Sequence, residues 1–344
     1  MNICFIMYPW ERVEPEKDST LRLIHECMRR GHRTVVATPA GLTMRRSVTN
    51  VFGKVLSVEG KFPTTSQSLY KKVKVKEKML PLAGFDVIFM RANPPIDSLM
   101  LNFLDSVKED VFIVNDIQGL REANNKLYTA SLDDSAHDII PVTYVSKNKE
   151  YLKRVIKESE DDKMILKPLD GMGGSGVIVV EKSATQNINS LLDFYISPGK
   201  DGKSNYVILQ EYIEGADQGD VRVLMLNGEP IGAMKRVPAA DDHRSNVSAG
   251  GSVKKHTLSK QEKALCKTIG TRLVQDGLYF VGLDIINGKL IEVNVCSPGG
   301  IVNINRLNKM KLQAKVIDFC ENVVKFKSAA DKRRIEFKQT VQNA

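Results

Sequence analysis

The feature that most constrains the fold of this 344-residue chain is the alternation of short apolar runs with helical patterns over its first third. Apolar residues recur at helical spacing from Ser19 to Arg30, and Gly31 follows as a helix terminator. Four apolar, β-branched runs have the pattern of buried strands: residues 2–8, 34–38, 85–91 and 112–115. Strands separated by helices pair in parallel, so this region is predicted to be an open α/β unit.

The rest of the chain predicts two further units. A small unit of strands and helices is expected first, with strands at 141–146, 164–169 and 177–181 and a helix at 149–158. An α+β unit with an antiparallel sheet is expected next, with strands at 206–213, 220–227, 280–286 and 289–296 and helices at 259–275 and 301–325. Residues 43–80 are lysine-rich with little periodicity and are expected to form a loop or an added hairpin.

The net charge of +9 is concentrated in two segments, residues 71–78 and residues 325–344, which carry +4 each. The first alternates Lys with Val and predicts a solvated strand edge, and the second predicts a polar tail. A nucleic-acid partner is not expected, because the aromatic residues of a single-strand binder are missing. No apolar run is long enough to span a membrane, so no membrane partner is expected.

The location predicted from the sequence is the cytoplasm. The N-terminal apolar stretch has no basic region ahead of it, unlike a secretory signal. The five cysteines are scattered and include no Cys-x-x-Cys spacing, which argues against a disulfide framework and a zinc site. The five histidines have no helix-spaced pairing, and Cys296 has no histidine nearby in the sequence, so nucleophilic catalysis is poorly supported.

The glycine-rich segment after Lys167 is the sharpest local motif. Four glycines lie within residues 171–176, directly after a predicted strand that ends with the lysine. Glycine allows backbone N–H groups to approach a ligand closely, which suits phosphate. The spacing matches neither the Rossmann nor the Walker pattern. We therefore expect a phosphate-binding turn, with a flexible hairpin that binds nothing as the alternative.

A predicted hairpin over residues 280–295 carries the candidate metal ligands Asp284, Glu292 and Asn294. A two-residue loop at Asn287-Gly288 would place the two carboxylates on opposite faces. A three-residue loop, residues 286–288, pairs Asp284 with Leu290 and aligns both apolar faces, so burial favours it. Two carboxylates and an amide oxygen then converge as a hard ligand set for Mg²⁺. A solvated polar face is the alternative.

Three other segments could contact an anionic ligand or a nucleotide. Ser297-Pro298-Gly299-Gly300 precedes the last helix and offers N–H groups to a substrate carboxylate. Residues 210–213 end a strand as an adenine-contacting hinge would, or as a plain strand end. Arg222 and Arg236 lie on adjacent predicted strands, and an arginine fork suits phosphate or carboxylate. Residues 244–251 are a polar, glycine-bearing loop that could cover a site.

These motifs, taken together and in order, resemble an ATP-grasp ligase, and in particular bacterial-type glutathione synthetase. The likeness covers about residues 1–320 and is carried by Lys126, the segment Lys167-Pro168-Leu169-Asp170-Gly171-Met172-Gly173-Gly174, residues 210–213, Asp220-Val221-Arg222, Ala249-Gly250-Gly251, Gly282-Leu283-Asp284 and Glu292-Val293-Asn294-Val295. Further matching pieces are Lys17-Asp18-Ser19, the segment Met90-Arg91-Ala92-Asn93-Pro94-Pro95, and Asn115 followed by residues 120–126.

The resemblance implies an ATP-grasp fold with four parts: an N-terminal α/β substrate domain at 1–122, a central lid at 123–203, a C-terminal catalytic domain at 204–325 and a basic tail at 326–344. ATP would lie between the lid and the catalytic domain. The implied nucleotide contacts are Lys126, Lys167, Gly171, Met172, Gly173, Gly174, Gln210, Glu211, Tyr212, Ile213 and Asp220. The implied ligands of two Mg²⁺ ions, with Mn²⁺ as an alternative metal, are Asp284, Glu292 and Asn294.

The implied reaction phosphorylates the C-terminal carboxylate of γ-glutamylcysteine to an acyl phosphate, which the amine of glycine attacks. The implied catalytic residues are Arg222, Arg236, Gly173 and Gly174. The implied substrate contacts are Lys17, Asp18, Ser19, Arg91, Arg222, Arg236, Asn246, Gly250, Gly251, Ser297, Gly299 and Gly300. The resemblance also implies a homo-oligomer.

The chain departs from the family pattern at four places that affect substrate choice. The chain has Ser297-Pro298-Gly299-Gly300 where the family usually has Ser-Pro-Thr. Val302, Ser252 and Tyr8 stand where two arginines and an acidic residue are usual. The departures leave ATP chemistry intact and bear on the amine acceptor and the acyl donor. Three alternatives therefore stay open: a ligase for another amine or acid, a non-catalytic nucleotide-binding protein, and a phosphotransferase that stops at the acyl phosphate.

Overall fold

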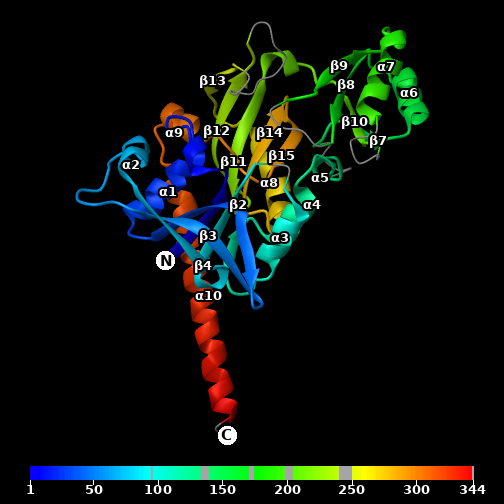
Figure 1. Cartoon of the computed structure of the whole chain (residues 1–344). Helices are drawn as coiled ribbons and strands as arrows, with labels where there is room; N and C mark the ends of the chain where they lie inside the picture. The colour runs from blue at the N-terminus through cyan, green and yellow to red at the C-terminus, as the bar shows by residue number, and fades with distance from the viewer. Residues whose placement is uncertain (94–95, 133–138, 170–173, 198–203, 240–249, 343–344) are drawn as a thin grey trace. The chain divides into compact units, whose positions relative to one another are not determined.

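The computed structural model describes residues 1–93, 96–132, 139–169, 174–197, 204–239 and 250–342. Its contacts divide the chain into two compact units (Figure 1). Unit 1 comprises Met1–Arg121, Val274–Phe280 and Cys296–Ala344, and unit 2 comprises Glu122–Leu273 and Val281–Val295. The four-part division expected from the sequence remains a prediction, although particular strands and helices change, as described below.

The described part of unit 1 is built on one sheet of six strands in the order β4-β3-β2-β1-β5-β6. Their bounds are β1 Asn2–Met7, β2 Arg33–Arg45, β3 Val48–Ser57, β4 Lys74–Pro81, β5 Val87–Arg91 and β6 Phe112–Val114. The pairs β1–β2, β1–β5 and β5–β6 are parallel, which confirms the predicted open α/β unit. Residues 43–80 add two antiparallel strands, and the lysine-rich β4 lies exposed at the sheet edge, as predicted.

The helices of unit 1 follow from apolar faces and side-chain caps. In α1 (Ser19–Arg29), Asp18 caps the N-terminus by accepting a hydrogen bond from the Leu21 N–H, and Leu21, Ile24 and Cys27 are fully buried. The other helices and short 3₁₀ turns are η1 Trp10–Arg12, α2 Ser66–Lys72, η2 Leu82–Gly84, α3 Ser98–Asp105, α4 Ile117–Ala123, α9 Ile301–Asn308 and α10 Leu312–Gln342.

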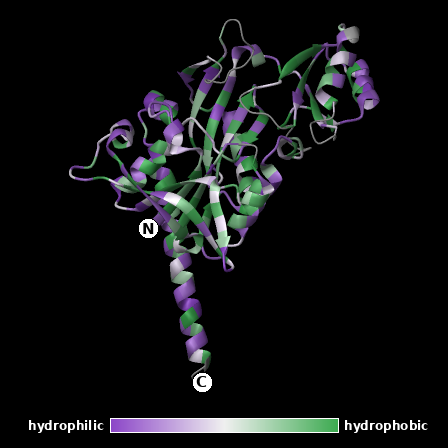
Figure 2. Cartoon of the chain, viewed as in Figure 1, coloured by the Kyte–Doolittle hydropathy of each residue, from purple (hydrophilic) through white to green (hydrophobic). Residues whose placement is uncertain are grey.

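The C-terminal region differs from its prediction in two ways. The expected helix at 301–325 is two helices, because Lys309 takes a left-handed conformation (φ 53°) and Asn305 caps the second by accepting from the Leu312 N–H. The expected polar tail is helical as far as Gln342, as the second half of α10. Figure 2 shows polar and apolar residues mixed along that half.

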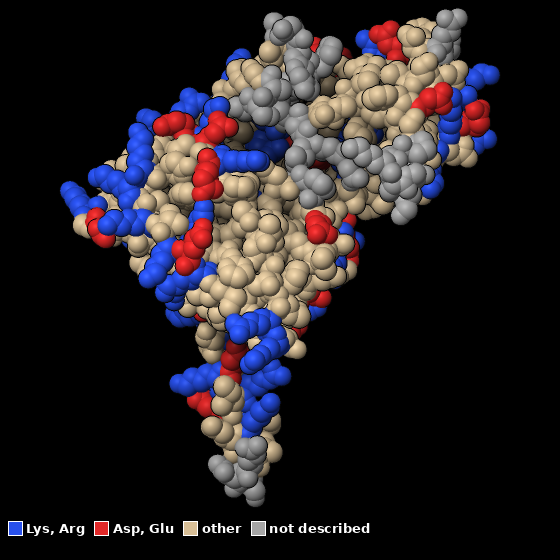
Figure 3. Space-filling model, in the orientation of Figure 1, with Lys and Arg blue, Asp and Glu red and all other residues tan. Residues whose placement is uncertain are grey.

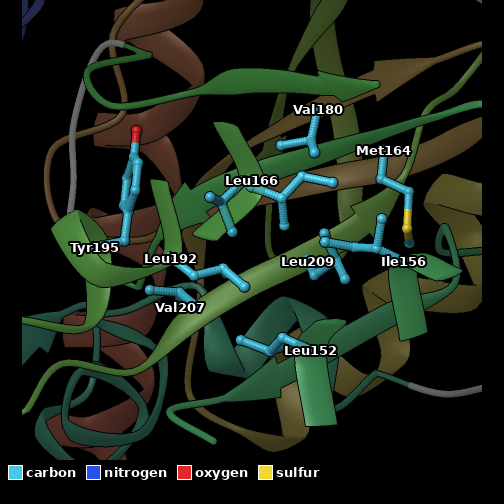
Figure 4. Packing of buried hydrophobic residues seen from close by; sticks show 10 residues of the cluster. Leu152, Ile156, Met164, Leu166, Val180, Leu192, Tyr195, Val207 and Leu209 are labelled. Atoms are coloured by element: carbon cyan, nitrogen blue, oxygen red, sulfur yellow. The ribbon is translucent and has the colours of Figure 1, made fainter. Parts of the chain in front are cut away.

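Unit 2 contains, among its described residues, a four-stranded antiparallel sheet in the order β7-β10-β8-β9. The bounds are β7 Thr143–Ser146, β8 Lys163–Pro168, β9 Ile178–Glu181 and β10 Val207–Glu211, with α5 Leu127–Ala130, α6 Lys149–Glu158 and α7 Thr185–Ile196. Side chains from α6, α7 and the strands pack in one core, which includes Leu152, Leu166, Leu192 and Leu209 (Figure 4). The strand β10, predicted to begin the third section, is hydrogen-bonded inside this sheet.

A second sheet of unit 2 has five described strands in the order β13-β12-β11-β14-β15. The bounds are β11 Asp220–Leu226, β12 Glu229–Val237, β13 Ser252–Lys255, β14 Phe280–Ile286 and β15 Lys289–Asn294, with η3 Ala216–Gln218 and α8 Lys260–Gln275. Every residue of β11 is buried, including Asp220 and Arg222. Within the described ranges, none of the helices has the length and hydropathy that a bilayer span needs.

Candidate functional site

The hairpin of β14 and β15 brings two carboxylates face to face. Its loop has two residues, Asn287 (φ 46°) and Gly288 (φ 77°), so the predicted three-residue loop is wrong. The extra residue lies instead in β15, where a β-bulge at Ile291 shifts the register and places Asp284 opposite Glu292 rather than Leu290. The two carboxylates therefore share one face of the sheet, as predicted, but the bulge and not the loop aligns them.

Asp284 is buried and is held by two arginines. Arg222 donates from Nε and Nη2 to its two carboxylate oxygens, at 2.5 Å and 2.9 Å, and Arg236 Nη2 lies 3.0 Å from Oδ2. Asn294 donates to the same carboxylate at 3.1 Å. Although burial opposes ionisation, the two arginines lower the pKa of Asp284 to about 2. Asp284 is thus a fixed negative charge.

A second arginine–carboxylate pair lies on the neighbouring strands. Asp220 and Arg236 are cross-strand partners in β11 and β12, and Arg236 donates to both oxygens of Asp220 at 2.6 Å. Both side chains are buried. The predicted residues Asp220, Arg222, Arg236 and Asp284 therefore form one connected network within unit 2.

Two lysines complete this charge cluster. Lys126 Nζ lies 3.7 Å from Glu292. Lys167 is 5% exposed, and its Nζ donates to Gln210 Oε1 at 2.9 Å. Burial lowers the pKa of Lys167 to about 8, against the attraction of Glu292. Burial and the Asp284 carboxylate raise the pKa of Glu292. Lysines from two separate segments are therefore brought beside the hairpin carboxylates.

The charges of this cluster suit a polyanion held together with a divalent cation. Among the described residues the cluster contains the cations Lys126, Lys167, Arg222 and Arg236 and the carboxylates Asp220, Asp284 and Glu292. Lysine and arginine side chains gathered at one place are suited to bind phosphate oxygens. Asp284, Glu292 and the amide of Asn294 offer hard oxygen donors, which fits Mg²⁺ shared with phosphate oxygens. In the described ranges, no group of three His, Cys, Asp or Glu residues forms an alternative metal site.

The remaining predicted nucleotide contacts lie between β8 and β9, at the end of β10, or outside the described residues. Gly174 is described, with φ 75°, a conformation that favours glycine, whereas Gly171, Met172 and Gly173 lie outside the described residues. At the end of β10, Glu211 accepts from the Val142 N–H at 3.0 Å and lies 3.5 Å from Lys289. Tyr212 and Ile213 follow directly, half-buried and buried respectively.

A second cluster of predicted residues lies in unit 1 around Arg91. This arginine is 3% exposed and donates from Nε to Thr20 Oγ1 at 3.0 Å and from Nη2 to the Pro298 carbonyl oxygen at 3.1 Å. Its Nη1 is buried without a hydrogen-bond partner among the residues that the structure describes. Burial lowers the pKa of Arg91 to about 10, partly offset by Asp18. An unsatisfied buried guanidinium N–H is unusual and points to an anionic ligand.

Neighbouring predicted residues join this cluster. Ser19 Oγ accepts from the Gly300 N–H at 3.3 Å, which ties the N-terminus of α1 to that of α9. Burial raises the pKa of the cap residue Asp18. Ser297 and Gly299 are half-buried on the segment that carries Pro298. Thr20 was missed by the sequence reasoning, although its place after Asp18-Ser19 at the start of α1 was a usable signal.

Other predicted substrate residues are placed differently. Lys17 is exposed and pairs with Glu14 at 3.1 Å, so it does not join the Arg91 cluster. Gly250 (φ 93°) and Gly251 precede β13 in unit 2, and Asn246 lies outside the described residues. A cavity of about 330 Å³ at the carboxyl end of β1, lined by Tyr8, Trp10 and Phe52 among others, was not predicted.

Comparison with known proteins gives consistent matches over nearly the whole chain. Residues 1–121 match the N-terminal domain of prokaryotic glutathione synthetase, and residues 125–309 match its ATP-grasp domain. The glutathione synthetase of Gloeobacter violaceus is 34% identical over 329 residues, covering 93% of this chain and 96% of that protein. The glutathione synthetase of Escherichia coli O6:H1 is 33% identical over 326 residues, covering 93% and 98%.

Solved structures share the fold at low sequence identity. The D-cycloserine synthetase DcsG has a TM-score of 0.61 at 16% identity, covering 95% of this chain and all of that chain. The ATP-grasp ligase PsnB, complexed with minimal precursor, Mg and ADP, has a TM-score of 0.59 at 15% identity, covering 94% and 98%. The fold is therefore the predicted ATP-grasp fold, and with both of its domains matched the chain belongs to the prokaryotic glutathione synthetase family.

Proposed function

We propose that this protein is an ATP-dependent carboxylate–amine ligase that joins γ-glutamylcysteine to glycine and releases glutathione, ADP and phosphate. Family membership over both domains supports the activity. The observation that carries the proposal is the pairing of Asp284 with Glu292 on one face of a sheet, surrounded by Lys126, Lys167, Arg222 and Arg236. That arrangement suits a triphosphate and its cation better than any uncharged ligand.

The nucleotide would be held by residues of unit 2. Lys126 and Lys167 would contact the phosphates, while Gln210, Glu211, Tyr212 and Ile213 would contact adenine and ribose. The hydrogen bond from Lys167 to Gln210 connects a proposed phosphate contact to β10, the strand that carries the proposed adenine contacts. Asp284, Glu292 and Asn294 would hold Mg²⁺, which neutralises charge on the phosphates when bound.

The proposed reaction has two steps. A carboxylate oxygen of γ-glutamylcysteine attacks the γ-phosphorus of ATP, and ADP leaves with the electrons of the broken phosphorus–oxygen bond. The amine nitrogen of glycine then attacks the acyl carbon, loses a proton, and displaces inorganic phosphate. Arg222 and Arg236 are fixed by carboxylates before substrate binds, so their positive charge is already oriented when negative charge develops on the transferred group.

Arg91 is proposed to bind a carboxylate of a substrate in unit 1. Its Nη1 group is buried and has no partner among the described residues, while Nε and Nη2 hold the guanidinium in place. The N–H groups at the start of α9 would add to the same preference for an anion. A homo-oligomer and a cytoplasmic location remain proposals from the sequence.

A ligase for another amine or acid is the second candidate. The departures at Tyr8, Ser252, Gly299-Gly300 and Val302 favour it, because the family resemblance implies that these positions contribute to substrate choice. The test is a phosphate-release assay with ATP and Mg²⁺, in which γ-glutamylcysteine and a panel of amines are varied one at a time. Release that needs both γ-glutamylcysteine and glycine supports glutathione synthesis. Release that prefers another amine, or ignores glycine, would refute it.

A further inference from the structure

The second half of α10 is an exposed amphipathic helix that the proposed ligase reaction does not use. The first half is anchored in unit 1, where Leu312, Val316, Ile317 and Cys320 are fully buried. Lys327 still donates to the Glu109 carbonyl oxygen. From residue 328 to residue 341 every side chain is exposed. The segment therefore extends beyond the rest of unit 1.

Apolar residues of this segment gather on one side of the helix. Phe326, Ala330, Phe337 and Val341 are spaced by four, seven and four residues, which keeps them within about 60° of one another around the helix axis. The large members are 72% (Phe326), 70% (Phe337) and 59% (Val341) exposed. We call these four residues the apolar stripe. Two aromatic rings exposed to water on a helix are unfavourable in free energy, and burial against a partner would remove that penalty.

Basic residues flank the apolar stripe on both sides. At about 100° per residue, Lys327, Arg334 and Lys338 lie along one edge, and Arg333 lies along the other. Residues 325–342 contain six basic and two acidic residues, a net charge of +4. Figure 3 shows Lys and Arg side chains around this helix. The exposed Ile335 lies on the opposite side from the stripe.

The charge distribution determines which partner fits. A second copy of this helix would bring +4 against +4, so self-association along the stripe is disfavoured. A flat surface that is apolar beneath and anionic above matches a helix whose apolar stripe has cations along both edges, because the lysine and arginine stems can reach up to the anionic groups while the rings insert. An anionic lipid bilayer has that structure.

We propose that residues 325–341 of α10 bind the surface of anionic lipid bilayers, with Phe326 and Phe337 inserted at the headgroup boundary. This goes beyond the ligase activity and replaces the sequence-based expectation of no membrane partner. The binding is peripheral, since the helix lies on the surface and does not cross the bilayer.

The test uses the full-length protein and two kinds of vesicle, pure phosphatidylcholine and phosphatidylcholine with about one-third phosphatidylserine. We expect co-sedimentation with the anionic vesicles, at least tenfold weaker binding to the neutral ones, and loss of binding at high salt. No sedimentation with anionic vesicles at low salt would overturn the proposal. Binding to an acidic protein without binding to vesicles would also overturn it, in favour of a protein partner.

Substitutions distinguish vesicle binding through the apolar stripe from non-specific adsorption. The double variant Phe326→Ser/Phe337→Ser should weaken vesicle binding at least tenfold, as should Arg333→Glu/Lys338→Glu. Ile335→Ser is the matched control, because it removes an equally exposed apolar side chain from the other side of the helix, and it should change binding less than twofold. Equal loss in Ile335→Ser and in the double phenylalanine variant would contradict the proposal. All variants should keep the ligase activity, so a failed ligase assay does not bear on this test.

Discussion

Buried arginines in the two units are stabilised in opposite ways. In unit 2, Arg236 is held by Asp220 and Asp284, and these carboxylates raise its pKa although burial opposes them. In unit 1, Arg91 is held by neutral oxygens of Thr20 and Pro298, keeps one N–H without a partner among the described residues, and has a lowered pKa. We call an arginine matched when buried carboxylates neutralise its charge, and unmatched when one of its N–H groups has no partner. A matched arginine belongs to the framework of a site, whereas an unmatched one can still donate a hydrogen bond to a ligand.

Removing the matched arginine should have the largest effect. Arg236→Met leaves the buried carboxylates of Asp220 and Asp284 short of a cation, which should lower the free energy of unfolding by about 3–5 kcal/mol. Urea unfolding followed by circular dichroism measures this. Arg91→Met is the paired control, since no buried carboxylate depends on it to the same extent. Equal destabilisation by the two variants would erase the distinction between the arginines.

Glu292→Gln tests whether the framework of unit 2 serves catalysis. The substitution keeps the shape of the side chain and removes a charge that lies opposite Asp284, so the fold should survive while turnover falls about 10²- to 10³-fold. Phosphate release and thermal melting measure the two quantities. Glu229→Gln, an exposed carboxylate in β12, is the control and should keep full activity. Wild-type turnover in Glu292→Gln would remove Glu292 from the site.

Arg91→Met tests whether the unmatched arginine binds substrate. Loss of a hydrogen bond between charged groups costs about 1.5–3 kcal/mol, so KM for γ-glutamylcysteine or glycine should rise about 10- to 100-fold. KM for ATP should stay within twofold, because the nucleotide contacts are proposed in unit 2. Arg91→Lys should fall in between, since it keeps the charge without the planar fork. Unchanged KM values for both amino-acid substrates would show that Arg91 is structural.

The smallest effect concerns a carboxylate matched by arginines in unit 1. Hydrogen bonds from Arg29, with further ones from Arg30 and against opposing burial, lower the pKa of Glu26 from 4.5 to about 2. A lowered folded-state pKa stabilises the protein above pH 4.5, and this contribution disappears as pH falls from 4.5 towards 2. Glu26→Gln should therefore flatten the fall of the urea midpoint in that pH range. Glu109→Gln, an exposed carboxylate, should leave the slope unchanged, and parallel curves for wild type and Glu26→Gln would contradict the expectation.

The sequence predicted which residues face the site better than it predicted the turn and the strand register that place them there. Alternation along β14 and β15, together with burial of both apolar faces, was enough to predict that Asp284 and Glu292 share one face, but it could not distinguish a longer loop from a bulge. The difference depends on Asn287 accepting a positive φ, which is a property of the folded turn.

Two other features depended on contacts distant in sequence. The strand β10 joins the sheet of β7 and β8 through pairing with residues 143–146 and 164–168, which local patterns do not specify. The tail after residue 325 was predicted from its polar composition, and only its continuation of an anchored helix shows that its apolar residues share a side. The unsatisfied N–H of Arg91 was equally beyond prediction, because it requires knowledge of burial.

The position of the bulge at Ile291 determines where the hairpin tolerates changes of length. Because alignment of the carboxylates is set inside β15, residues can be inserted between Ile286 and Lys289 without turning Glu292 away from Asp284. Deleting a single residue from β15 would instead invert every side chain on one side of the deletion. A tag or sensor peptide inserted near the proposed nucleotide site should therefore be tolerated at the tip of the hairpin and not within β15.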